Sequence, residues 1–239
     1  HLGRKYNLKD FQFSQSYFMF WDKIEKSNYF LESIIQTAEK KWNSRLVMHL
    51  LSNPIQDGGQ WDMWVNLVKK YGVVPQSEMP ESFSSSSSRM MNRMITRKLR
   101  ENALTLRKLV HSGSPIDDVQ AHKINMMEEI YKMLTIHLGT PPNSFDWQVR
   151  DKKKKFIRFE GMTPITFYNE HVDLNLDDYV CLINCPMSDK NYNEVYTVDY
   201  LGNVIEGNSI RYLNVESHIM KEATIESLKK NEPVWFGCD

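Results

Sequence analysis

The sequence predicts an α+β protein with two lobes. Over the first 140 residues, apolar side chains recur at three- and four-residue spacing, which is typical of amphipathic helices. The later residues contain short alternating segments separated by turn residues, as expected of mostly antiparallel strands. Helices first and strands later favour separate helical and β-rich lobes over an alternating α/β arrangement.

The first predicted helix covers residues 16–40, with Ser14 or Ser16 as its N-cap. A short helix follows at residues 45–51. A third helix begins near Gln60 and ends at Gly72, where a left-handed cap precedes a proline. The apolar stripe of the first helix consists of Tyr17, Phe20, Trp21, Ile24, Leu31, Ile34 and Ile35.

A serine-rich segment, "PESFSSSSS" at residues 80–88, is interpreted as a low-complexity joint. Beyond it, residues 89–111 and 115–138 predict two long helices that form a hairpin. Such a hairpin suits either an insertion on a core fold or a platform for partner subunits.

The second half predicts a β-hairpin, "SFDWQVR" and "FIRFEG", around the solvated loop "DKKKK" at residues 151–155. A short helix begins at Thr163, with Pro164 in its first turn. We expect strands in "DYVCLINCP", "VYTVDYL" and "SIRYLNV", a helix at 218–230 and a buried strand in "PVWFGC". Because an apolar strand normally lies inside a sheet, and because the chain begins at His1 rather than at a methionine, we expect an internal piece of a longer protein.

Composition bounds the function classes. The 239 residues are 41% hydrophobic and 25% charged, which predicts a globular protein with a real core. Lys+Arg and Asp+Glu both total 30, so no overall field attracts nucleic acid or anionic membranes. No apolar span reaches membrane length, and three cysteines suit a reducing compartment. We therefore expect a cytoplasmic protein without a membrane or nucleic-acid partner.

The glycine pair Gly58–Gly59, in "NPIQDGGQWDMW", comes directly before a predicted helix. It is not a phosphate loop, because the Walker and dinucleotide-binding glycine patterns are absent and Asp57 would repel a phosphate. Two interpretations stay open. The pair forms a tight turn, or its bare backbone lets an extended peptide pair with it as an added strand.

The sequence predicts neither a metal site nor a nucleophile. The histidines show no metal-binding spacing, and Cys181 and Cys185 would lie about 13 Å apart on one strand. These two cysteines are expected to be core thiols. Cys238 is followed by Asp239, whose negative charge disfavours a reactive thiolate, so a structural or pocket-lining role is expected there.

Several motifs together resemble the bleomycin hydrolase and aminopeptidase C branch of the papain-like cysteine peptidases. They include "FQFSQSYFMFWDKIEKSNYFLE", "NPIQDGGQWDMWVNLVKKYGVVPQSEMPES", "LGTPPNSFDWQVRDK", "TPITFYNEHV", "YTVDYLGN" and "PVWFGCD". The resemblance implies a papain-like fold with a cleft between two lobes. It assigns residues 1–83 to the helical lobe, 84–143 to a helical-hairpin insertion and 144–239 to an incomplete β-barrel lobe.

The resemblance also implies the substrate-binding residues. Gly58 and Gly59 would line the cleft and pair with the substrate backbone, with Gln60 and Trp61 alongside. Gly237 would open a side-chain pocket on the opposite wall.

The catalytic residues that the resemblance implies have no counterpart in the chain. No cysteine here precedes a tryptophan as the family's nucleophile does. The nucleophile is therefore expected upstream of His1, and the histidine base and its asparagine are expected downstream of Asp239. No catalytic residue is assigned within the chain.

These implications predict a cysteine aminopeptidase that removes N-terminal residues from peptides through an acyl-enzyme, without metal or cofactor. The family assembles as homohexamers, so a homo-oligomer is expected. The chain alone is expected to be inactive. The alternative is a catalytically inactive peptide-binding or oligomer-scaffold protein on the same fold. A weaker rival is nucleic-acid binding through "DKKKK" and the helix at 89–107.

Overall fold

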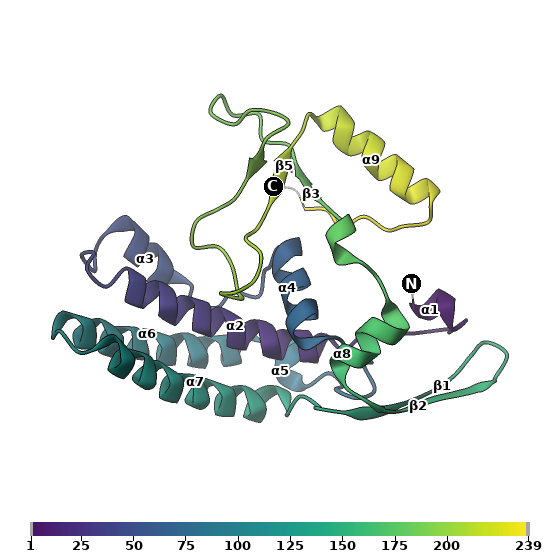
Figure 1. Ribbon diagram of the computed structural model, residues 1–239, viewed down its shortest axis with the longest axis horizontal. Coiled ribbons are helices and arrows are strands. Elements are labelled where there is room, and N and C mark those ends of the chain that lie inside the picture. Colours follow the sequence, from purple (N-terminus) through teal and green to yellow (C-terminus); the bar gives the residue numbers. More distant parts are fainter. Residues whose placement is uncertain (1, 238–239) are drawn as a thin grey trace. The chain divides into compact units, whose positions relative to one another are not determined.

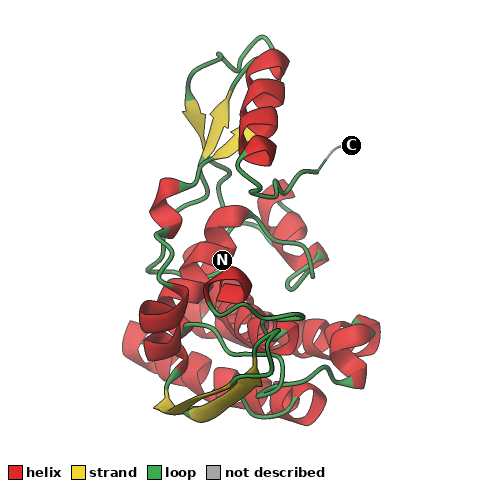
Figure 2. Ribbon diagram, turned by 90° about the vertical axis from the view of Figure 1, so that its right-hand side faces the viewer, coloured by secondary structure: helices red, strands yellow, loops and turns green. Residues whose placement is uncertain are grey.

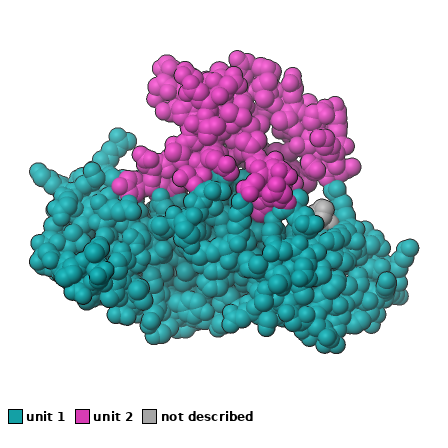
Figure 3. Space-filling view, viewed as in Figure 1, with its two compact units in different colours: residues 1–174, 202–208 teal, residues 175–201, 209–239 magenta. Residues whose placement is uncertain are grey.

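The computed structural model describes residues 2–237, so His1, Cys238 and Asp239 lie outside the described part of the chain (Figure 1). The chain falls into two compact units, coloured separately in Figure 3. Unit 1 comprises residues 1–174 and 202–208, and unit 2 comprises residues 175–201 and 209–239. Helices dominate unit 1 and both units contain a small sheet, so the predicted α+β class is confirmed.

Helix α2 (Gln15–Gln36) is the central element of unit 1. It packs against α3 (Arg45–Ser52), α4 (Trp61–Tyr71), α6 (Arg89–His111) and α7 (Ile116–Leu138). The Ser14 hydroxyl caps α2 by accepting the Tyr17 N–H at 3.0 Å, as one of the two predicted caps requires. The helix ends before residue 40, because Thr37 begins a turn and the Arg107 guanidinium binds its carbonyl at 3.0 Å.

The predicted hairpin is confirmed: α6 and α7 lie side by side along α2 (Figure 1). Its buried side chains recur at helical spacing, which fixes the face each helix turns inward. Those with no exposed surface are Met91, Ile95, Leu99, Leu106, Ile130 and Leu134.

The serine run, interpreted from the sequence as a joint, is partly helical. It contains a short helix, α5 (Phe83–Ser86), with a capping box between Ser82 and Ser85. The Ser84 hydroxyl also lies 3.0 Å from Nδ1 of His137 on α7. Serine hydroxyls satisfy helix-end backbone groups, so this run folds although its one large apolar side chain, Phe83, is 85% exposed.

The predicted β-hairpin consists of β1 (Phe145–Arg150) and β2 (Phe156–Met162), which pair antiparallel. The lysine-rich loop between them is exposed, as predicted. Helix α1 (Leu2–Lys5) leads to Tyr6, which meets Trp147 edge-on at 6.0 Å. Thr163 caps α8 (Pro164–Phe167), and a π-helix, η1 (Tyr168–Val172), follows it.

Unit 2 contains three short strands and one long helix (Figure 2). The strands are β3 (Cys181–Ile183), β4 (Val195–Tyr196) and β5 (Tyr212–Asn214), in the order β3-β5-β4. β5 pairs parallel with β3 and antiparallel with β4, so only part of this sheet follows the predicted antiparallel pattern. The remaining elements are the 3-10 helix η2 (Leu176–Asp178) and α9 (Ser217–Lys229).

The predicted strand at 233–238 does not form over its described residues, 233–237. Trp235 is 70% exposed and Phe236 is 89% exposed, so the predicted burial is also wrong there. A strand needs a neighbouring edge to satisfy its backbone groups. Within residues 2–237, no other strand pairs with this segment.

Residues 2–237 include no helix that is both long enough and apolar enough to cross a bilayer.

Candidate functional site

The loop between α3 and α4 carries the glycine pair. Gly58 and Gly59 are both exposed, and a Cβ added to either would meet no atom within 4 Å. Neither glycine has a positive φ. Left-handed backbone and close packing, the two usual reasons for glycine, are therefore both absent here. The tight-turn interpretation loses its physical basis, because a larger residue would fit the fold at either position.

The backbone N–H groups of the pair are also open. Within the part of the chain that the structure describes, the N–H groups of Gly58 and Gly59 donate to no backbone carbonyl. Exposed and unpaired backbone groups are what an extended peptide needs in order to add a strand. The loop thus presents a short peptide edge with no side chains over it.

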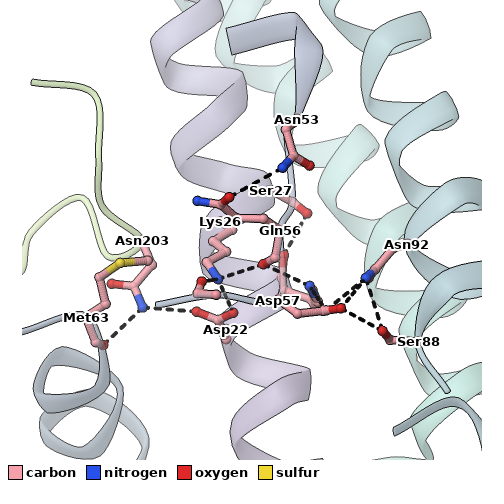
Figure 4. A network of polar contacts seen from close by, with 12 residues as sticks. Asp22, Lys26, Ser27, Asn53, Gln56, Asp57, Met63, Ser88, Asn92 and Asn203 are labelled. Carbon is pink, nitrogen blue, oxygen red and sulfur yellow. Dashed lines mark hydrogen bonds and ion pairs between the residues drawn. The ribbon is translucent and has the colours of Figure 1, made fainter. Parts of the chain in front are cut away.

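The buried side chain of Lys26 holds this loop in place (Figure 4). The Lys26 ammonium donates to the carbonyls of Gln56 at 2.8 Å and Gly58 at 2.7 Å, and it pairs with Asp22 at 2.6 Å. Lys26 lies on α2 and is only 5% exposed. Burying a charge is costly unless it is fully bonded, so Lys26 needs all three contacts, and the two to the Gln56 and Gly58 carbonyls fix the path of the loop.

Asp57 ties the same loop to two helices. Its carboxylate pairs with buried Lys23 of α2 at 2.7 Å, and it accepts from the Ser88 hydroxyl and the Asn92 amide of the α6 end at 2.7 and 2.8 Å (Figure 4). Burial alone would raise the pKa of Asp57, but these hydrogen bonds outweigh it and lower the pKa to about 2. Burial lowers the pKa of Lys23, and its bond to Asp57 opposes that shift.

Gln60 and Trp61 continue directly into α4. Gln60 is the N-cap residue of the helix, and its carbonyl accepts the Trp64 N–H at 3.2 Å. The Trp61 ring is half-buried, with its centroid 5.2 Å from that of Trp64. Four of the five predicted binding residues therefore lie in one continuous segment of unit 1.

A second loop braces the start of α4. Asn203, which is 1% exposed, donates to the Met63 carbonyl at 3.0 Å. Asn66 exchanges two 2.9 Å hydrogen bonds with the backbone of Asn208. A Cβ on Gly207 would lie 2.6 Å from Asn66, so glycine is required for this approach.

Gly237 belongs to unit 2 and lies in the irregular segment that ends the described chain. A Cβ there would also meet no atom within 4 Å. Its assignment to a substrate pocket stays a prediction.

The cysteines show no catalytic arrangement in the described residues. Cys181 begins β3 and Cys185 follows that strand, and both are half-buried rather than core thiols. Cys238 lies outside the described residues. Across residues 2–237, no three His, Cys, Asp or Glu side chains are grouped closely enough to hold a metal ion.

His1 and Asp239 are the two positions beyond which the catalytic groups are expected. Both lie outside the described residues, so the structure assigns neither of them a place in a site. The location of the nucleophile before His1, and of the histidine and asparagine after Asp239, stays a prediction.

Sequence reasoning missed the residues that support the site. Lys23 and Lys26 sit within three residues of each other on α2, and on sequence alone they suit a solvated face. One signal of their burial was available in the sequence. The long predicted helix carries apolar residues on several faces, which indicates that it is buried on all sides. His171 was also missed; it is buried, lies 2.8 Å from the Tyr6 hydroxyl, and burial lowers its pKa.

Comparison with known proteins decides the family. A sequence profile described as the Peptidase C1-like family matches residues 1–239. The chain belongs to the Peptidase C1-like family. This Peptidase C1-like chain is 50% identical over 232 residues to an aminopeptidase C of Listeria innocua serovar 6a, a match that covers 97% of the chain and 52% of that relative. It is 46% identical over 240 residues to a bleomycin hydrolase of Gallus gallus, covering 99% of the chain and 53% of the relative.

A solved structure agrees with both the family and the fold. The crystal structure of PepW from Lactobacillus rhamnosis matches with a TM-score of 0.97 at 47% identity, over 99% of this chain and 53% of that one. The resemblance inferred from the motifs is confirmed, together with the fold class. The Peptidase C1-like chain spans about half the length of the relatives it matches.

Proposed function

We propose that this chain is the substrate-binding part of a cysteine aminopeptidase that removes N-terminal residues from peptides. The observation that carries the proposal is the open edge at Gly58 and Gly59, which has no side chains and whose N–H groups donate to no backbone carbonyl in the described structure. The names of the relatives, aminopeptidase C and bleomycin hydrolase, support the same reaction class.

In this proposal, an extended peptide pairs with the backbone of the glycine pair. The Gly58 carbonyl is already bound by Lys26, so the Gly59 backbone is the more accessible partner. Fixing the peptide backbone in this way would align its scissile carbonyl with an attacking thiolate. That attack forms an acyl-enzyme and releases the peptide remainder, and water then hydrolyses the thioester.

The catalytic groups would come from parts of the protein outside these 239 residues, with the thiolate before His1 and the histidine base after Asp239. Two observations support this. No cysteine in the chain is followed by tryptophan, and the chain corresponds to only about half of each relative. The chain by itself would then have no peptidase activity, and no metal or cofactor is assigned to the reaction.

We extend the proposal to assembly and location. Residues 84–143 would be an insertion between lobes 1–83 and 144–239, and it would contribute to a homohexamer. Exposed apolar side chains on the hairpin support an interface, among them Ile124 and Ile136, which are 58% and 84% exposed. A low cysteine content supports a cytoplasmic location.

The test is intact-mass analysis after treatment with an epoxide inhibitor of cysteine peptidases, on this chain and on the natural-length protein. We expect one adduct on the natural-length protein and none on this chain. An adduct on Cys181, Cys185 or Cys238 would overturn the location of the nucleophile. No adduct on either sample would favour the inactive peptide-binding alternative.

A further inference from the structure

A second surface lies beside the 53–57 loop. It is a groove of about 700 Å³ between this loop and the first three turns of α6. Four arginines line it: Arg89, Arg93, Arg97 and Arg100. Three of them recur every four residues, so they form one stripe along the same face of the helix.

One of these four arginines is bonded to the loop, and the other three are exposed without a carboxylate partner in the described chain. Arg100 is committed to the loop, because its guanidinium donates to the carbonyls of Leu51 and Ser52 at 2.8 Å each. Arg89, Arg93 and Arg97 are exposed, and among residues 2–237 no carboxylate pairs with them.

The acidic side of the groove is already compensated. Among the described residues that line it, Asp57 alone carries a carboxylate, and Lys23 neutralises its charge. The groove therefore carries about four uncompensated positive charges, three of them on arginines that are not bonded to the loop, although the whole chain is neutral.

The spacing of the stripe fits an extended peptide. Residues four apart on a helix are separated by about 6 Å along its axis. Alternate side chains of an extended peptide lie about 6.6 Å apart on one face. Carboxylates on alternate residues would thus meet Arg89, Arg93 and Arg97 in turn, each as a bidentate pair.

The remaining lining favours a peptide over a nucleic acid. Within the described part of the chain, no aromatic side chain lines the groove, so bases would have no stacking platform. The polar lining residues Asn53, Gln56 and Thr96 instead offer amide and hydroxyl groups as hydrogen-bonding partners.

We propose that the groove between the 53–57 loop and α6 binds an acidic peptide segment through Arg89, Arg93 and Arg97. Neither glycine of the edge is among the described residues that line this groove, and the site needs no catalytic group. The proposal therefore stands whether or not the protein is a peptidase.

The test uses fluorescein-labelled hexaglutamate and the natural-length protein, with binding followed by fluorescence anisotropy. Reversing two charges in Arg93→Glu/Arg97→Glu should weaken binding by about tenfold or more, because two charge-assisted contacts are lost. The matched control is Lys108→Glu, an exposed position on the same helix outside the groove. It should change the dissociation constant by less than about twofold.

A second variant guards against misfolding. Arg93→Lys/Arg97→Lys keeps the charge and removes the planar forks, so binding should weaken by about two- to fivefold while the thermal midpoint stays unchanged. Equal weakening by Lys108→Glu would overturn the site, as would hexaglutamate affinity that neither arginine variant alters. A six-residue oligothymidylate that binds more tightly than hexaglutamate would overturn the choice of a peptide ligand.

Discussion

The loop at 53–61 and the segment at 232–237 were predicted to contact the same peptide, yet they differ in how they are held. Each contains glycine and tryptophan close together, and each glycine has open space around it. The loop is bound by two buried ammonium groups and by the end of α6. The segment leaves Trp235 and Phe236 exposed and takes part in no sheet over its described residues.

The difference lies in the kind of partner each region needs. Side chains of a helix can satisfy loop carbonyls from within the same unit, as Lys23 and Lys26 do for Gln56 and Gly58. A strand needs another backbone edge, and that edge is absent from residues 2–237. Four substitutions test this contrast.

Among the four test substitutions, with the controls set aside, the largest loss of stability is expected from Lys26→Met. It removes the donor to Gln56 and Gly58 and leaves Asp22 without its 2.6 Å partner. Breaking a buried pair from one side should lower the free energy of unfolding by about 3 kcal/mol. Urea denaturation would measure it, with exposed Lys132→Met on α7 as the control, which should stay within about 0.5 kcal/mol. A loss below about 1 kcal/mol would mean that the loop does not depend on α2.

The next largest effect is expected from Gly59→Val, which should weaken peptide binding while leaving the stability of the fold nearly unchanged. Its side chain would fill the space above the loop, raising KM and lowering kcat/KM of the natural-length protein by about tenfold. The free energy of unfolding should change by less than about 0.5 kcal/mol. Peptidase kinetics and urea denaturation measure the two effects separately.

Gly72→Val is the matched control, and its result should be the reverse. A Cβ there would lie 2.2 Å from the Pro164 backbone, at a φ of +71°. Stability should fall by several kcal/mol, at the high end of single substitutions. If Gly59→Val left the kinetics unchanged, the pairing role of the glycine edge would be rejected.

Asp57→Asn tests the acid dependence of the loop. The folded-state pKa of about 2 lies below the ordinary value of 3.8, so the contribution of this carboxylate is complete above about pH 4. It is lost as the pH falls from about 4 to about 2. Because the side chain is 48% exposed, solvent screening limits the contribution to about 1 kcal/mol. Urea midpoints at about pH 5 and about pH 2.5 should converge for the two proteins at the lower pH, and a constant difference would refute the assignment.

The smallest effect is expected from Gly237→Ala. The added methyl group meets no atom, so unfolding should change by less than about 0.3 kcal/mol. The fall in kcat/KM should also be smaller than for Gly59→Val, since only one methyl group is added. A destabilisation above about 1 kcal/mol would show that residues 232–237 are packed, and the contrast with the loop would then disappear.

Sequence reasoning was most successful for the helices, which are marked locally by the spacing of apolar residues and by capping residues. Helices α2, α4, α6 and α7 were found because apolar spacing and residues such as Ser14 and Gly72 mark them locally. The anchors of the glycine loop were missed because Lys23 and Lys26 meet carbonyls about 30 residues away. The parallel pairing of β5 with β3 and the absence of a strand at 233–237 depend on neighbours that no local pattern specifies.

The contacts of the serine run, residues 80–88, limit the insertions and deletions that this part of the chain can accept. At its start Ser84 contacts His137, and at its end Ser88 contacts Asp57. Loss of one serine between them would shorten this connection by up to about 3.5 Å, so the contacts of Ser84 and Ser88 would be kept together only if the start of α6 and its arginines moved. A repetitive segment usually accommodates insertions and deletions, but the length of this one is fixed by the contacts at its two ends. Its residues are exchangeable in identity more readily than in number.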